Sequence, residues 1–150
     1  MPDPEKALKH LYRVTKPGGQ CYITSWHRME HKEMAARILR RLRGESVNVA
    51  ETFPLWTPQM EDPKYLPSAL EKVGFENTGG EVRPDKMVYR GQDVIRIGYE
   101  FLPRLYERMI TLEDGEQEKW NQLWNEELEK AISSDTLTIP AWAIIAWGTK

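Results

Sequence analysis

The sequence predicts an α/β fold in which helices alternate with a small number of hydrophobic strands. Apolar residues recur at helical spacing over residues 30–43, which indicates an amphipathic helix. A short apolar run over residues 21–26 follows a Pro-Gly-Gly turn, and a near-continuous apolar run covers residues 139–147. Because the chain has 150 residues, 40% of them hydrophobic, we expect residues 1–150 to form a single domain around one core.

A first helix is expected near the N-terminus, followed by a strand. Asp3 is a favourable N-cap and Pro4 a favourable first helical residue. The turn over residues 17–19 ends this helix, and the strand follows over residues 21–26. The apolar side of the helix is formed by Leu8, Leu11 and Tyr12.

Two further helices are expected in the first half of the chain. The helix over residues 30–43 stops at Gly44, and another helix ends at Val73 with Gly74 in the left-handed cap position. Residues 45–61 contain two prolines and no periodicity, so we interpret them as a lid-like loop.

The second half of the chain is predicted to contain one weak strand, two helices and a closing strand. Gly79-Gly80 interrupts the strand over residues 75–82. Asp93 opens a helix with apolar residues at positions 94, 97, 101 and 105, and Pro103 kinks it. Asp114 and Gln117 form a capping-box pattern before the next helix. The apolar run over residues 139–147 indicates a strand that is buried on both faces.

Composition and charge exclude several classes of function. A net charge of -2 gives no electrostatic support for binding to nucleic acid or to an anionic membrane. No apolar run approaches the roughly 20 residues of a membrane span. The N-terminal residues lack the pattern of a secretion signal, and Cys21 alone cannot form an internal disulfide. We therefore expect a cytoplasmic protein.

Three short motifs occur in order along the chain. They are Arg-Val-Thr-Lys-Pro-Gly-Gly at residues 13–19 before a strand, Leu-Glu-Lys-Val-Gly-Phe at 70–75, and Ala-Ile-Ile-Ala-Trp-Gly-Thr-Lys at 143–150. This ordered set resembles the C-terminal half of a class I S-adenosylmethionine-dependent methyltransferase. The resemblance implies a Rossmann-like sheet of strand order 3-2-1-4-5-7-6, of which this chain would supply strands five, six and seven with flanking helices.

The glycine-rich loop that holds S-adenosylmethionine in this family has no counterpart in the sequence. By this resemblance no residue matches the cofactor site, and we expect no cofactor unless a separate N-terminal half supplies it. Without the family's fourth strand, the strand over residues 21–26 would be an open edge. We expect a homodimer formed through this edge, with a separate partner chain as the alternative.

Candidate acid and base residues follow the carboxyl end of the same strand, where open α/β sheets place their ligand sites. His27 and His31 are four residues apart with Glu30 between them, so a short helix would place both imidazoles on one side. Histidine titrates near neutrality and suits general acid-base catalysis. The letters His-x-x-Glu-His also match a zinc-protease pattern, but a strand precedes them directly, so we expect no metal.

A pocket for an apolar or aromatic small molecule is expected around aromatic residues near this cluster. Trp26 ends the strand, Phe53 and Trp56 lie in the lid-like loop, and Tyr99 could donate a hydrogen bond. The basic run of Arg37, Arg40, Arg41 and Arg43 is more typical of a solvated helix face than of a phosphate site.

Three functions are consistent with these features. The first is a methyltransferase-derived protein that tailors a small molecule by a cofactor-independent step such as cyclisation, isomerisation or dehydration. The second is the C-terminal part of a small-molecule methyltransferase that needs a separate N-terminal half. The third is a non-catalytic interaction subunit that dimerises with a full-length relative.

Overall fold

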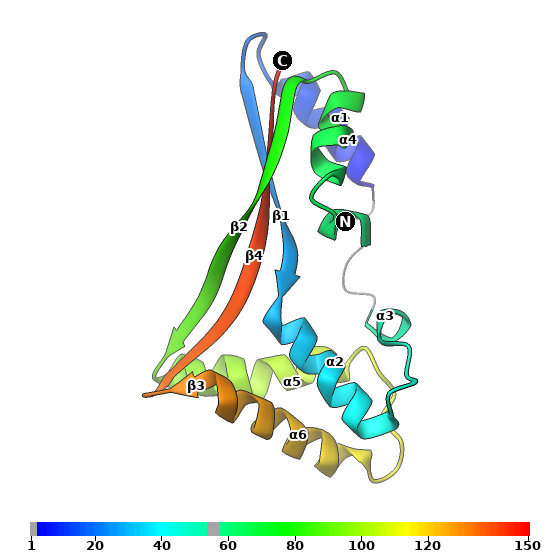
Figure 1. Cartoon of the computed structure of the whole chain (residues 1–150), viewed down its shortest axis with the longest axis vertical. Helices are drawn as coiled ribbons and strands as arrows, with labels where there is room; N and C mark the ends of the chain where they lie inside the picture. The colour runs from blue at the N-terminus through cyan, green and yellow to red at the C-terminus, as the bar shows by residue number, and fades with distance from the viewer. Residues whose placement is uncertain (1–2, 54–57) are drawn as a thin grey trace. The chain divides into compact units, whose positions relative to one another are not determined.

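The computed structural model describes residues 3–53 and 58–150 and has the predicted mixed α/β composition (Figure 1). Its described residues divide into two compact units. Unit 1 comprises residues 3–28, 58–85 and 142–150, and unit 2 comprises residues 29–53 and 86–141.

The sheet has four strands, is antiparallel and is open, with the order β1-β4-β2. β1 spans Gln20–Met29, β2 spans Glu76–Arg90 and β4 spans Thr136–Thr149. The short β3 (Ile132–Ser133) pairs with β4, with Ile132 opposite Leu137. β1 and β2 are thus the two edges of the β1-β4-β2 path among the described strands.

Six α-helices and two irregular helices accompany this sheet in the described residues. The α-helices are α1 (Pro4–Val14), α2 (Glu30–Arg43), α3 (Val49–Thr52), α4 (Tyr65–Lys72), α5 (Leu102–Glu107) and α6 (Glu116–Ala131). A 3-10 helix, η1 (Pro58–Glu61), and a π-helix, η2 (Val94–Phe101), complete the set.

The predicted start of α1 is confirmed, but the predicted apolar side of the helix is only partly buried. The Asp3 carboxylate accepts a hydrogen bond from the Lys6 amide at 3.0 Å, and Pro4 is the first helical residue. Leu8 is buried and Tyr12 packs beside it in the core of unit 1. Leu11 was expected on the same side, yet it is exposed, because it lies about 100° around the helix from Tyr12.

The segment from residue 45 to residue 61 contains helices where a loop was expected. α3 begins at Val49, where the Asn48 side chain caps the Glu51 amide, and η1 covers residues 58–61. Asparagine is a good N-cap, so the signal for α3 was present in the sequence and outweighed by the nearby prolines. Phe53 is 7% exposed and belongs to the core of unit 2.

β2 is a 15-residue strand, and its glycines do not interrupt it. A Cβ built on Gly79 would lie 2.7 Å from the Trp147 ring, and one built on Gly80 would lie 2.8 Å from Cγ of Pro67. Glycine is therefore required at both positions because an indole of β4 and a proline of α4 approach the backbone closely.

We expect a Gly79→Ala variant to lose about 1–3 kcal/mol of unfolding free energy, because the added methyl group forces the Trp147 ring to move. Urea unfolding monitored by tryptophan fluorescence measures this loss. Glu76→Ala changes an exposed residue of the same strand and serves as the control. Equal stability of the two variants would contradict the packing role of Gly79.

The helices between β2 and β4 differ from their predicted form. The predicted apolar stripe placed Phe101 in the core, but Phe101 is 52% exposed, because η2 is a π-helix and its side chains do not follow the 3.6-residue period. The capping box is also absent. Gly115, with φ of 86°, is the N-cap of α6, and the Glu113 amide donates to the Glu116 carboxylate at 2.8 Å.

β4 was predicted to be buried on both faces, but its burial alternates. Residues such as Leu137, Ile139 and Ala141 are fully buried, whereas the residues between them are half-buried or exposed. The buried residues of β4 belong to two separate cores. Ile144 and Ala146 lie in the core of unit 1 with residues of α1 and α4, and Leu137 and Ile139 lie in the core of unit 2 with residues of α2 and α6.

Candidate functional site

His31 is buried in unit 2 and is held by Tyr106. His31 is 8% exposed, and its Nδ1 lies 2.6 Å from the Tyr106 hydroxyl. Burial, reinforced by the positive charge of Lys32, lowers the pKa of His31 to about 4. Burial also raises the pKa of Tyr106, so the phenol keeps its proton. His31 is therefore a neutral imidazole at neutral pH, and its Nδ1 shares one hydrogen bond with the Tyr106 hydroxyl.

His27 lies in β1 and is anchored by η1. Its Nδ1 is 2.8 Å from the backbone carbonyl of Glu61. Since a carbonyl oxygen only accepts, Nδ1 carries the proton and donates it, which leaves the lone pair on Nε2 in the neutral ring. Two residues earlier, the Ser25 hydroxyl donates to the Met60 carbonyl at 2.9 Å. These two bonds fix residues 60 and 61 against the same strand.

The prediction that one short helix carries both imidazoles is wrong. β1 continues to Met29, so His27 is a strand residue, whereas His31 is in the first turn of α2. Met29 is 4% exposed, and its burial in an extended conformation explains why the strand does not end at residue 26.

Glu30 is part of an ion-pair network rather than an isolated carboxylate. Its Oε1 accepts from Nη1 of Arg37 at 3.0 Å. The same guanidinium donates from Nη2 to Glu127 at 2.7 Å, and Lys130 donates to the other Glu127 oxygen at 2.6 Å. The Glu127 side chain is 5% exposed. Burial alone would raise its pKa, but the hydrogen bonds from Lys130 and Arg37 hold the pKa below its usual range.

Of the predicted substrate-binding residues, Trp26 belongs to unit 1, whereas Phe53 and Tyr99 belong to unit 2. Phe53 meets the Tyr106 ring edge-on at 5.1 Å between centroids, so it packs inside unit 2 and is not a cover over a pocket. Tyr99 is 37% exposed on η2, and Trp26 is half-buried in β1 of unit 1. Trp56 lies outside the described residues.

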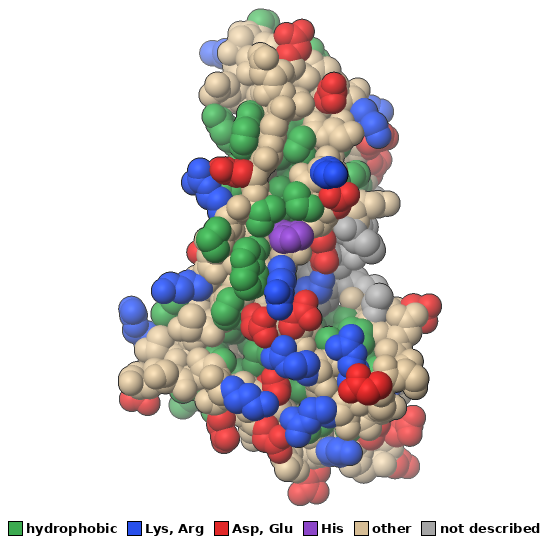
Figure 2. All heavy atoms as spheres, viewed as in Figure 1, with side chains coloured by type: hydrophobic (Ala, Val, Ile, Leu, Met, Phe, Trp, Pro, Cys, Tyr) green, Lys and Arg blue, Asp and Glu red, His purple; other side chains and the backbone are tan. Residues whose placement is uncertain are grey.

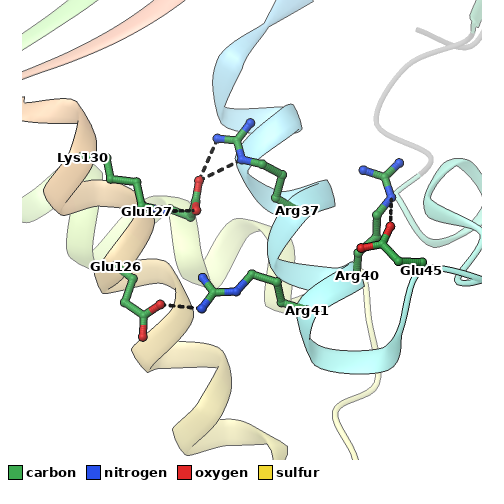
Figure 3. A pocket seen from close by; sticks show the side chains of 7 residues that line it. All are labelled: Arg37, Arg40, Arg41, Glu45, Glu126, Glu127 and Lys130. Carbon is green, nitrogen blue, oxygen red and sulfur yellow. Dashed lines mark hydrogen bonds and ion pairs between the residues drawn. The ribbon is translucent and has the colours of Figure 1, made fainter.

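A charged groove lies between α2 and α6 in unit 2, and Figure 3 shows the side chains that line it. Its volume is about 500 Å³. Arg41 donates to Glu126 at 2.6 Å, and Arg40 lies 4.0 Å from Glu45. In Figure 2 acidic and basic side chains alternate over this surface. Its lining residues are Arg37, Arg40, Arg41, Glu45, Glu126, Glu127 and Lys130.

The ion pairs that line this groove hold α2 against α6, and they leave little positive charge available to bind an anion. Arg37 and Arg41 are both engaged by carboxylates of α6, so an incoming anion would have to displace them. Sequence reasoning missed Glu127, although a signal for this residue existed. It lies three residues after Trp124 and four after Leu123 on the buried stripe of α6, where a carboxylate needs partners.

A Glu127→Gln variant is expected to lose about 1–3 kcal/mol of unfolding free energy, because a buried carboxylate with three charged hydrogen bonds becomes a neutral amide. Chemical denaturation measures the loss. Glu126→Gln is the matched control, since Glu126 pairs with Arg41 at a more exposed position of the same helix. A larger loss in the control would show that Glu127 does not hold α2 to α6.

Within residues 3–53 and 58–150, no group of three or more His, Cys, Asp or Glu side chains is arranged to hold a metal ion. In the same residues no helix is both long and apolar enough to cross a membrane. No protein-family model matches the sequence, and no match was found among curated proteins.

Proposed function

We propose that this chain is the acceptor-binding part of a class I S-adenosylmethionine-dependent small-molecule methyltransferase, with the cofactor-binding part supplied by other residues. The observation that carries the proposal is the sheet order β1-β4-β2. In chain order these are the first, third and second long strands, which is the order 5-7-6 in which the family's sheet ends.

The three sequence motifs support the same alignment. Lys16-Pro17-Gly18-Gly19 lies between α1 and β1. The motif at residues 70–75 covers the end of α4, and Gly74, with φ of 108°, makes the turn into β2. The motif at residues 143–150 falls in β4. Each motif therefore accompanies a different strand of the sheet.

In this function the chain contributes the residues at the carboxyl end of β1. Trp26 offers an aromatic surface, and the lone pair on His27 Nε2 can accept the proton that a hydroxyl or amine acceptor loses when it is methylated. S-adenosylmethionine would supply the methyl group. We find no residues in this chain that match the family's site for it, so the chain alone is expected not to bind the cofactor.

The test compares the chain alone with the chain joined to a cofactor-binding half. Calorimetric titration of S-adenosylmethionine into the chain alone is expected to give no heat of binding, whereas the joined protein binds it and transfers labelled methyl groups to aromatic acceptors. His27→Ala should lower the transfer rate by about 10²–10⁴-fold without weakening cofactor binding. The control is His10→Ala, which changes a histidine at an exposed position of α1. A joined protein that binds the cofactor but methylates no acceptor would contradict the proposal.

A second candidate is a cofactor-independent tailoring step on an apolar or aromatic metabolite, such as cyclisation, isomerisation or dehydration. The observation that favours it is the anchored tautomer of His27, which presents a base without help from a cofactor. In this case the open edge of β1 pairs with a second copy of the chain. Full activity of a His27→Ala/His31→Ala double variant would remove both histidines from such a mechanism.

A further inference from the structure

Ser25 and His27 extend from one face of β1 to the carbonyl end of η1, and all of these residues belong to unit 1. Side chains two residues apart in a strand point to the same side. The Ser25 hydroxyl donates to the Met60 carbonyl at 2.9 Å. His27 Nδ1 donates to the next carbonyl along the chain, that of Glu61, at 2.8 Å. Two neighbouring carbonyls are therefore bound by two side chains of one strand.

The residues after η1 explain why these two carbonyls bond to side chains of β1. In a 3-10 helix each carbonyl accepts from the amide three residues later. For Met60 that residue is Pro63, which has no N–H. For Glu61 it is Lys64, whose amide donates instead to the Asp62 carboxylate at 2.9 Å. The sequence Asp62-Pro63-Lys64 thus leaves both carbonyls for Ser25 and His27.

η1 is also joined to α4 by a short hydrogen-bonded turn. The Gln59 carbonyl accepts from the Asp62 amide at 3.2 Å, and the Asp62 carbonyl accepts from the Tyr65 amide at 3.1 Å. Leu70 of α4 is fully buried in the core of unit 1, and the Met60 side chain packs against the same core. Core packing therefore holds the Met60 side chain, while the two hydrogen bonds from β1 hold the last two carbonyls of η1.

The bond between His27 and η1 determines which ring nitrogen can act as a base. A neutral imidazole carries one proton, and the partner of one nitrogen selects the tautomer. The Glu61 carbonyl only accepts, so it selects the proton on Nδ1 and leaves the lone pair on Nε2. A displacement of this carbonyl by about 1 Å would break the bond and release the other tautomer, in which Nε2 carries the proton and cannot accept one.

We propose that Ser25 is a positioning residue for His27. The carbonyls of Met60 and Glu61 belong to consecutive peptide units, so the Ser25 hydroxyl, by holding the first, fixes the place of the second. His27 is thereby kept in the tautomer that presents Nε2 as a base. The role of His27 as a base rests on the proposed function, whereas the link from Ser25 to the tautomer of His27 does not.

Nitrogen-15 NMR of the labelled chain at pH 8, above the usual histidine pKa of about 6.5, tests this link. A ring nitrogen with a proton and one with a lone pair have well separated chemical shifts. The chain has three histidines, and the signals of His27 are those that disappear in His27→Ala. We expect the wild type to carry the proton on Nδ1 and Ser25→Ala to show both tautomers.

Two further variants serve as controls in the same measurement. Ser25→Thr keeps a hydroxyl at the position and should retain the proton on Nδ1. Thr24→Ala removes the exposed hydroxyl of the preceding residue, which points to the other face of β1, and should leave the tautomer unchanged. Far-UV circular dichroism verifies that all variants are folded.

The protein joined to a cofactor-binding half gives a second readout. Ser25→Ala should lower its rate of methyl transfer about tenfold without weakening cofactor binding, and Ser25→Thr should recover most of the rate. The loss is smaller than that expected for His27→Ala, because the base is still present in part of the molecules.

Two results would overturn the proposal. One is a wild-type chain in which His27 carries its proton on Nε2. The other is a Ser25→Ala chain in which His27 keeps the proton on Nδ1, even if methyl transfer slows, because the slower rate would then have another structural cause. A joined protein that binds the cofactor but methylates no acceptor would contradict the proposed function, while the spectrum of the isolated chain would still decide the role of Ser25.

Discussion

Replacing Trp124 with alanine is expected to lower the free energy of unfolding by about 3–5 kcal/mol, a large part of the roughly 5–15 kcal/mol that stabilises a typical domain. Trp124 is fully buried in the core of unit 2. Its ring stacks on Tyr106 at 5.5 Å between centroids and meets Trp120 at 5.9 Å. Alanine leaves a cavity that the rigid neighbouring rings cannot fill.

The measurement is urea unfolding, followed by far-UV circular dichroism so that the loss of a tryptophan does not distort the signal. Trp142→Ala is the matched control, since Trp142 is a half-buried tryptophan of unit 1 with the Arg28 guanidinium over its ring at 5.0 Å. We expect a smaller loss there. Equal losses of unfolding free energy in the two variants would contradict the larger packing contribution that we assign to Trp124.

Trp124→Phe is expected to recover most of the lost stability. The indole N–H groups of Trp120 and Trp124 have no hydrogen-bond acceptor among the described residues. Phenylalanine removes one of these donors and keeps an aromatic ring against Tyr106, so the change loses contact area without breaking a hydrogen bond.

Stability is also expected to fall by about 3 kcal/mol between pH 7.5 and pH 4 because of His31. The pKa of His31 is about 4 in the folded protein, against about 6.5 in the unfolded chain. Between these values the unfolded state binds a proton that the folded state does not. The contribution is therefore complete above pH 6.5 and is lost as the pH falls toward 4.

Denaturant unfolding at a series of pH values checks this expectation. His31→Gln should be less stable than the wild type at neutral pH and should lose the slope between pH 6.5 and pH 4. His10→Gln, at an exposed position of α1, should keep the wild-type slope. A wild-type profile that is flat over this range would mean that His31 becomes charged without cost.

Local sequence signals predicted those elements whose structure depends on neighbouring residues. Asp3 and Pro4 start α1, Gly44 stops α2, and Gly74 turns the chain into β2, each through a backbone preference that acts within a few residues. The alternation of helices and strands followed from these signals. The mixed α/β composition was therefore predictable from the sequence.

The sequence predictions that were wrong concern features that depend on contacts between residues far apart in the chain. Gly79-Gly80 looked like an interruption of a strand because the sequence does not reveal that Trp147 and Pro67 press against it. His31 was a candidate acid or base, but it is 8% exposed beside Tyr106, 75 residues later in the chain, and its burial keeps it neutral. The boundary between β1 and α2 lies later in the chain than predicted for a similar reason, because the burial of Met29 extends the strand.

The interleaving of the two units has a consequence for the order in which the chain can fold during synthesis. The segments of unit 2 have all been synthesised once residue 141 is in place. Unit 1 still lacks Ile144 and Ala146, which belong to the same hydrophobic cluster as Leu8 and Phe75. Residues 3–28 and 58–85 of unit 1 are synthesised before Trp142–Lys150, so their core is completed only after the last segment of unit 2 has been made, and their apolar side chains are open to transient contacts until then.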